Sequence, residues 1–131
     1  MAYSHQNVTL RGFHFEDFSL TVNLAAGIVA ADVGKALSWD TTGPNKMKLA
    51  ADGEEIVARL ATVENRTVEG TLIGAAEFRF SNTLPIKAGQ TVAVGAKAVG
   101  AGAGEIKAAG AGVAGLQVVE ILGNFAVVSK L

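Results

Sequence analysis

The chain has 131 residues, no cysteine and nearly balanced charge, with eleven Lys and Arg against twelve Asp and Glu. The lack of cysteine excludes disulfides, thiolate chemistry and cysteine-ligated zinc. The charge balance excludes the strong field that draws proteins to nucleic acid or to an anionic membrane. Half of the residues are apolar but only 6% are aromatic, which favours thin strands and tight turns within one domain over a thick helical core.

The first twenty residues predict an extended N-terminal arm, residues 1–20. Half of the chain's aromatic residues lie there among polar residues without turn signals: Tyr3, Phe13, Phe15 and Phe18. We expect these side chains to bind a partner; the alternative is that the arm folds back and fills its own barrel. The segment also lacks the apolar core of a signal peptide, so synthesis in the cytoplasm is expected.

Residues 21–131 predict a single β-barrel domain. Short runs of Val, Ile and Leu recur there at close intervals with Gly, Asn or Asp between them, which is typical of a small all-β barrel or sandwich. The longest apolar run, residues 24–31, is too short to span a bilayer. Asp32 is expected to cap a short helical turn near residues 32–37. Trp39, the single tryptophan, follows this turn and is expected either to plug the barrel or to lie in a subunit interface.

Charged and aromatic residues alternate along residues 77–81, which predicts a strand with both rings on one face. Pro85 and Gly89 then predict a turn near residues 87–90, because proline removes a hydrogen-bond donor and glycine permits positive φ.

Two stretches resemble one another, residues 33–53 and residues 94–110. Each reads as a turn, a strand, a hairpin tip at residues 40–45 or 100–104, and a return strand. A duplicated hairpin unit is one explanation. Chance matches between segments rich in Ala and Gly are the other.

Residues 110–115 read Gly-Ala-Gly-Val-Ala-Gly and match the dinucleotide-binding fingerprint. That fingerprint opens a helix, whereas a β-branched, strand-like run follows here, so a glycine-rich turn is the better interpretation. The two histidines, His5 and His14, lie in the arm without a carboxylate or histidine at metal-site spacing. No metal and no cofactor are therefore expected.

Acidic residues cluster at Glu54, Glu55, Glu64 and Glu69. General acid catalysis needs one carboxyl in an apolar pocket beside another that stays ionised. These acids lie near turns, which favours a solvated rim. The sequence therefore predicts no catalytic residue and no enzyme.

Several motifs in order along the chain resemble the capsid decoration (cement) proteins of tailed bacteriophages. They are Gly-Ile-Val-Ala-Ala-Asp-Val-Gly-Lys-Ala-Leu (27–37), Lys-Leu-Ala-Ala-Asp-Gly (48–53), Ile-Val-Ala-Arg-Leu (56–60), residues 84–94 and Gly-Ala-Gly-Glu-Ile-Lys-Ala-Ala (102–109). The resemblance covers residues 22–131. It implies a β-tulip-like barrel on the outer surface of the virion, bound to an HK97-like major capsid protein. It also implies homotrimers at threefold and quasi-threefold positions, or dimers, and no catalytic residues.

The expected function is therefore to bind the outside of the mature shell, made in the host cytoplasm, and to stabilise it. The barrel would supply rigidity while the arm lies across neighbouring coat subunits. The alternative is a carbohydrate- or host-surface-binding module, which would need exposed aromatics in the barrel loops, where only Trp39 qualifies.

Overall fold

The computed structural model describes residues 15–66, 68, 70–109 and 116–130. Among these residues the only helix is one 3-10 turn, η1 (Ala30–Asp32), and the other elements are strands. The predicted all-β class is therefore confirmed. The strands are β1 (Phe15–Leu24), β2 (Ala36–Trp39), β3 (Lys46–Leu49), β4 (Ala58–Leu60), β5 (Glu64–Arg66), β6 (Thr71–Pro85), β7 (Lys97–Gly102), β8 (Glu105–Ala108), β9 (Leu116–Leu122) and β10 (Phe125–Lys130).

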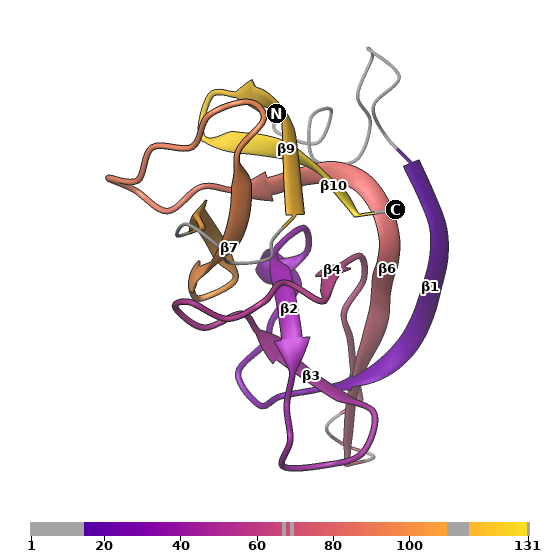
Figure 1. The fold of residues 1–131 in the computed structure, drawn as a ribbon. Coiled ribbons are helices and arrows are strands. Elements are labelled where there is room, and N and C mark those ends of the chain that lie inside the picture. The colour runs from indigo at the N-terminus through magenta and orange to yellow at the C-terminus, as the bar shows by residue number, and fades with distance from the viewer. Residues whose placement is uncertain (1–14, 67, 69, 110–115, 131) are drawn as a thin grey trace.

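Five strands close into a β-barrel in the order β1-β3-β2-β4-β6, because β6 returns to pair with β1. We call this barrel the first ring. Its one parallel contact joins β1 to β3, where Asn23 pairs with Lys46 and Leu24 with Met47. The neighbouring strands β1 and β6 form the long curved wall on the right of Figure 1.

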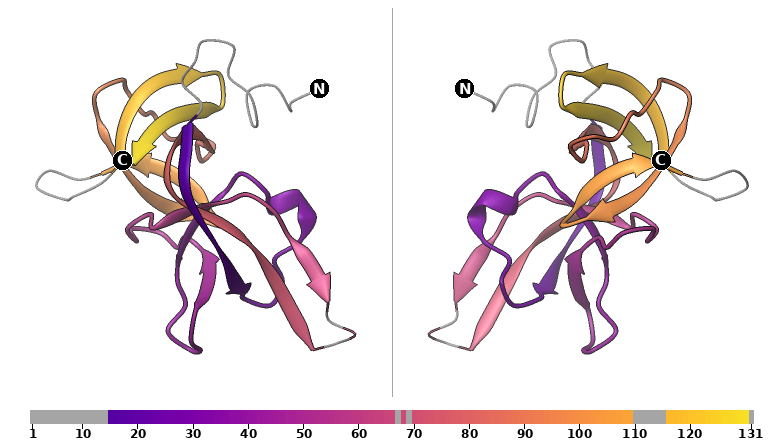
Figure 2. Two further views of the ribbon diagram at one scale, coloured as in Figure 1. Left: turned by 90° about the vertical axis from the view of Figure 1, so that its right-hand side faces the viewer. Right: turned by 90° about the vertical axis from the view of Figure 1, so that its left-hand side faces the viewer.

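The last part of β6 begins a second ring. This strand has 15 residues and extends beyond β4 to pair with β10, and the order continues through β9 and β7 to β8. The parallel bridge between Ile86 and Ile106 closes the circle, and the Lys87 N–H donates to the Ile106 C=O at 3.0 Å. Figure 2 shows the C-terminal strands β9 and β10 above the β2–β3 hairpin in both views.

The two rings repeat one another in strand order and in register. Gly34 donates its N–H to the Leu60 C=O at 2.7 Å, and Gly95 does the same to Val118 at 2.9 Å. These two bonds align the rings strand by strand. Strands β2, β3 and β4 of the first ring correspond to β7, β8 and β9 of the second. Strand β1 corresponds to the second half of β6, and the first half of β6 corresponds to β10. The two stretches that resemble one another in sequence occupy matching places in the two rings, and the structural match extends to all five strands.

Each ring has its own apolar core, and matching positions fill both. The first core contains Val22, Leu37, Met47, Ala58, Leu60 and Ala76. Their counterparts in the second are Leu84, Ala98, Ile106, Leu116, Val118 and Val128. One pair exchanges sizes: Leu37 faces Ala58 in the first ring, whereas Ala98 faces Leu116 in the second. The exchange keeps the summed side-chain volume constant, as close packing requires.

The short helical turn lies earlier than predicted. It ends at Asp32, because Gly34 adopts φ +95° and strand β2 begins two residues later. Asp32 closes the turn instead of starting it: its carboxylate accepts the Val29 N–H at 3.0 Å and pairs with Lys35 at 2.9 Å. Burial raises the pKa of Asp32, but these two donors outweigh it and hold the pKa below its ordinary value.

The predicted boundary between arm and barrel is wrong. Strand β1 begins at Phe15, whose backbone pairs with Ser81 of β6. Residues 15–20 therefore belong to the barrel wall. Register shifts on either side of Phe18 interrupt the pairing of this strand with β6. Such bulges hide the two-residue alternation of side chains by which a strand is predicted from sequence.

The predicted turn at residues 87–90 is confirmed, and the first ring has its counterpart. Gln90 donates to the Lys87 C=O at 3.0 Å, and Ile28 donates to the Ala25 C=O at 3.4 Å. Gly89 and Gly27 have φ of +85° and +95°. Positive φ at this third position defines a type II turn, in which proline is favoured just before the glycine.

Replacing Ala26 or Ala88 with proline should therefore stabilise the protein. Both residues are exposed and immediately precede the glycine, and neither N–H takes part in the turn hydrogen bonds. Proline restricts the unfolded chain, which is worth about 0.4–1 kcal/mol at a compatible position. Urea unfolding would check both variants, and a lower midpoint in either would show that its turn is not of type II.

Candidate functional site

Trp39 lies at the end of the first ring, a place that fits both sequence interpretations, a plug of the barrel end and an interface residue. It is the last residue of β2 and is 46% exposed. Its ring lies against that of Phe78, with centroids 5.8 Å apart. A half-exposed tryptophan anchored by a second aromatic ring is typical of an interface residue, the second of these interpretations.

The position that matches Trp39 in the second ring is Gly100, and it is covered. Gly53 donates to the Gly100 C=O at 2.8 Å, and the Gly100 N–H donates to the Glu54 C=O at 2.8 Å. A Cβ at this glycine would lie 2.5 Å from the Ala51 carbonyl oxygen. The two rings therefore differ at this position: one is sealed by the chain's own backbone, and the other presents an indole.

Leu20 is a further exposed apolar side chain of the first ring. Its Cα partner on β6 is Ala76, which points into the first core. Phe78, two residues further along β6, lies on the same face. Leu20 is 45% exposed. We call Leu20, Trp39 and Phe78 the apolar mouth of the first ring.

Beside this mouth, β1 has an open edge. Strand β3 covers it only at Asn23 and Leu24, so none of the described strands pairs with the outer edge of residues 15–22. Asn45 caps part of it, donating its Nδ2 to the Thr21 C=O at 3.2 Å and accepting the Asn23 N–H. Because backbone groups alternate along a strand, those of the exposed residue Ser19 also face outward.

The matching edge in the second ring is complete. Ser81 corresponds to Ser19, and on the edge away from β10 it pairs with Phe15 of β1. Thr83 corresponds to Thr21, and its C=O accepts the Arg59 Nε at 2.8 Å. Among the described residues, the first ring has no strand that covers the same level as Phe15 does in the second.

A buried ion pair lies between the rings. Arg59 and Glu77 are Cα partners on β4 and β6, 2% and 4% exposed, with 3.5 Å between Nη1 and Oε1. Arg59 also caps Thr83, so its guanidinium links both parts of β6. The matching pair in the second ring is Gln117 and Ser129, which carries no charge. Both side chains of the Arg59–Glu77 pair are almost fully removed from solvent.

Two cavities lie at matching places in the two rings. The apolar cavity has a volume of about 560 Å³ and is lined by Leu24, residues 26–29 and 70–72, Lys46 and Asn65. The polar cavity, about 420 Å³, is lined by residues 85–90 and 123–125 with Glu105. Matching lining residues are Leu24 and Ile86, Ala26 and Ala88, Gly27 and Gly89, Ile28 and Gln90, Lys46 and Glu105, Thr71 and Gly123, and Leu72 and Asn124.

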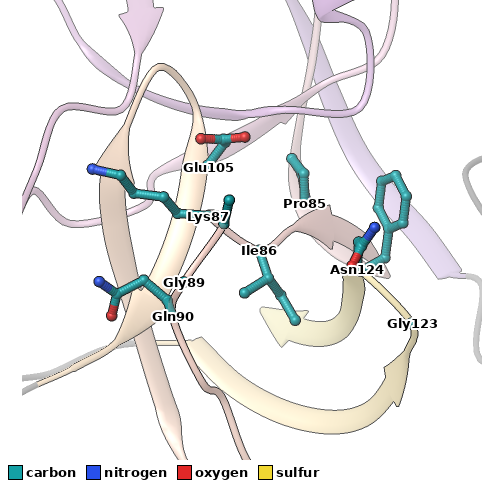
Figure 3. A pocket seen from close by; sticks show the side chains of 10 residues that line it. Pro85, Ile86, Lys87, Gly89, Gln90, Glu105, Gly123 and Asn124 are labelled. Atoms are coloured by element: carbon teal, nitrogen blue, oxygen red, sulfur yellow. The ribbon is translucent and has the colours of Figure 1, made fainter.

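The polar cavity has an apolar floor and polar walls. In Figure 3, Ile86 lies at the centre, with Lys87 and Gln90 on one side and Asn124 on the other. Glu105 closes a third side. None of these four polar side chains makes a hydrogen bond or an ion pair with another described residue.

Where the structure describes them, the acidic residues singled out from sequence form ion pairs or are exposed. Glu54 pairs with Lys48 at 3.1 Å and Glu64 with Arg66 at 2.7 Å, while Glu55 is exposed. Within the described ranges, no three His, Asp or Glu residues are placed to hold a metal ion. The remaining sequence candidates lie outside those ranges: Tyr3, Phe13, His5, His14, Glu69 and the glycine-rich residues 110–115.

Sequence reasoning missed Leu20, Phe78 and Arg59. Phe78 was placed on a strand face, but nothing in the sequence indicates that this face opens at Trp39. No helix in the described part of the chain is long and apolar enough to cross a membrane. No protein family, curated protein or solved structure matches the chain.

Proposed function

We propose that this protein is a decoration protein of a tailed-bacteriophage head, which binds the outer surface of the major capsid protein lattice and stabilises the mature shell. The observation that carries the proposal is the open edge of β1 beside the apolar mouth. An exposed strand edge binds extended segments through main-chain hydrogen bonds, and a central tryptophan is the commonest kind of interface anchor.

The closed first ring suits this role because it holds the edge and the mouth rigid. A rigid surface loses little conformational entropy on binding, so more of the interaction energy appears as affinity. A protein that binds the assembled shell but not its dissociated subunits shifts the equilibrium toward the shell. Assembly of the protein as a trimer, or as a dimer, would strengthen this effect through effective concentration.

Co-sedimentation with undecorated mature heads tests the proposal directly. We expect saturable binding, a fixed number of copies per head, and heads that survive heating or chelator treatment better than bare ones. The copy number distinguishes threefold from twofold placement. Absence of binding to heads would refute the proposed function.

Trp39→Ala should weaken binding to heads without unfolding the protein. Loss of an interface anchor costs about 2 kcal/mol or more, which is about a thirty-fold weaker affinity. The matched control is Val94→Ala, because Val94 is 64% exposed and lies in the second ring. Equal weakening by both variants, or by neither, would exclude the apolar mouth from the contact.

Removing residues 1–14 should leave the barrel folded but reduce its retention on heads. All described strand pairs involve residues from Phe15 onward, so the thermal midpoint should be unchanged. Removing residues 1–18 should lower the midpoint, because it deletes the part of β1 that pairs with Arg79, Phe80 and Ser81. Circular dichroism and co-sedimentation of both truncations would check this. If the protein without residues 1–14 bound heads as well as the full chain, Tyr3 and Phe13 would be excluded from the contact.

A further inference from the structure

We propose that the polar cavity of the second ring binds a neutral, hydroxylated ligand of the carbohydrate class. The comparison between the two rings carries this inference. The strand order and the two turns, which have Gly27 and Gly89 at the same position, match in both rings. The side chains that line the two cavities differ.

At two of the matching positions, the second ring has an amide side chain where the first has an aliphatic one. Ile28 of the apolar cavity is buried, whereas its counterpart Gln90 is exposed. Leu72 is likewise replaced by Asn124. Amide side chains both donate and accept hydrogen bonds, so they can bind the paired hydroxyl groups of a sugar ring.

Charge argues against an ionic ligand. One cation, Lys87, and one anion, Glu105, line the polar cavity, so its formal charge cancels. A phosphate or a carboxylate would lie close to Glu105, and an ammonium group close to Lys87. A neutral ligand can accept from the ammonium and donate to the carboxylate at once.

The floor supplies the apolar part of the site. Ile86, Pro85 and Phe125 line the same cavity. Small-molecule sites typically combine such an apolar surface with a few polar groups that fix orientation. A pyranose ring has one face of C–H groups and a rim of hydroxyls, which matches an apolar floor with polar walls.

The location of the cavity leaves it accessible on a decorated head. The connection from β6 to β7 that forms one wall extends away from the β2–β3 hairpin in Figure 1. Trp39, the last residue of β2 before the tip of that hairpin, belongs to the proposed capsid contact. Accessibility on the head rests on the proposed function, whereas the ligand class does not.

The test uses the isolated full chain, so its result is independent of head binding. Backbone amide resonances would be followed by NMR during titration with cellotriose, maltotriose, chitotriose and galactotriose at millimolar concentration. At least one saccharide should saturably shift the resonances of residues 87–90 and of Asn124. No shift with any of the four, or shifts confined to other residues, would overturn the proposal.

A reciprocal pair of variants makes the test specific. Gln90→Ile with Asn124→Leu gives the second ring the residues of the first, and binding should be lost. Ile28→Gln with Leu72→Asn changes the first ring alone, and the shifts at residues 87–90 should persist. If the variant with Gln90→Ile and Asn124→Leu still bound the saccharide, the proposed site would be overturned. Should that variant fail to fold, the location of the shifts in the unmodified protein still decides the question.

Discussion

Exchanging Leu37 and Ala58 should cost far less stability than either substitution alone. Leu37→Ala leaves a cavity in the first core, which costs about 2–5 kcal/mol. Ala58→Leu overfills it, at about 1–3 kcal/mol. The two residues are Cα partners in the first core, so the double variant restores the volume and should lie within about 1.5 kcal/mol of the unmodified protein. Urea unfolding of the three variants measures the coupling.

The second ring provides the matched control, because Ala98 and Leu116 already show the exchanged arrangement. The opposite exchange there, Ala98→Leu with Leu116→Ala, should be tolerated equally well. Additive costs in either double variant would contradict the structural equivalence of the two cores, since independent sites add and packed neighbours do not.

Arg59→Gln should be among the most destabilising single substitutions, at about 3–5 kcal/mol, because it leaves a buried carboxylate without its partner charge. Glu77 is 4% exposed, and Arg59 also donates to the Thr83 carbonyl. Adding Glu77→Ser should recover much of the loss, because the pair then matches Gln117 and Ser129 of the second ring. Chemical denaturation of the single and double variants would measure both effects.

Lys48→Gln serves as the control for that experiment. Lys48 pairs with Glu54, and both side chains are 36% exposed. An ion pair of this exposure contributes about 0–1 kcal/mol. If Arg59→Gln cost no more than this control, the buried pair would not stabilise the region between the rings.

The strand character of the chain could be predicted because alternation and turn residues are local signals. The turn at residues 87–90 and the hairpin tip at residues 40–45 both lie where the sequence placed them. The second tip is shorter than predicted, at residues 103–104, because β7 continues to Gly102. Its Gly104 packs closely on Lys35 and Leu49, and such a contact between the rings is invisible in the sequence.

The features that define the candidate site depend on pairings between distant residues. Arg59 and Glu77 each read as a charged residue on a strand, and only their register shows that they are buried together. The exposure of Trp39 depends on the lack of a covering segment like the one that seals Gly100. Sequence could suggest an interface for Trp39 but could not decide between it and a plug.

Strand β6 also determines how this molecule comes apart. Its 15 residues pair with β1 and β4 toward one end and with β10 toward the other. Although there are two cores, opening either ring strips β6 of hydrogen-bond partners that hold it in place for the other. Repeat proteins usually unfold unit by unit, because each unit has its own complete set of elements. Here the two units have one strand in common, so we expect them to unfold as a single cooperative unit and neither half of the chain to fold alone.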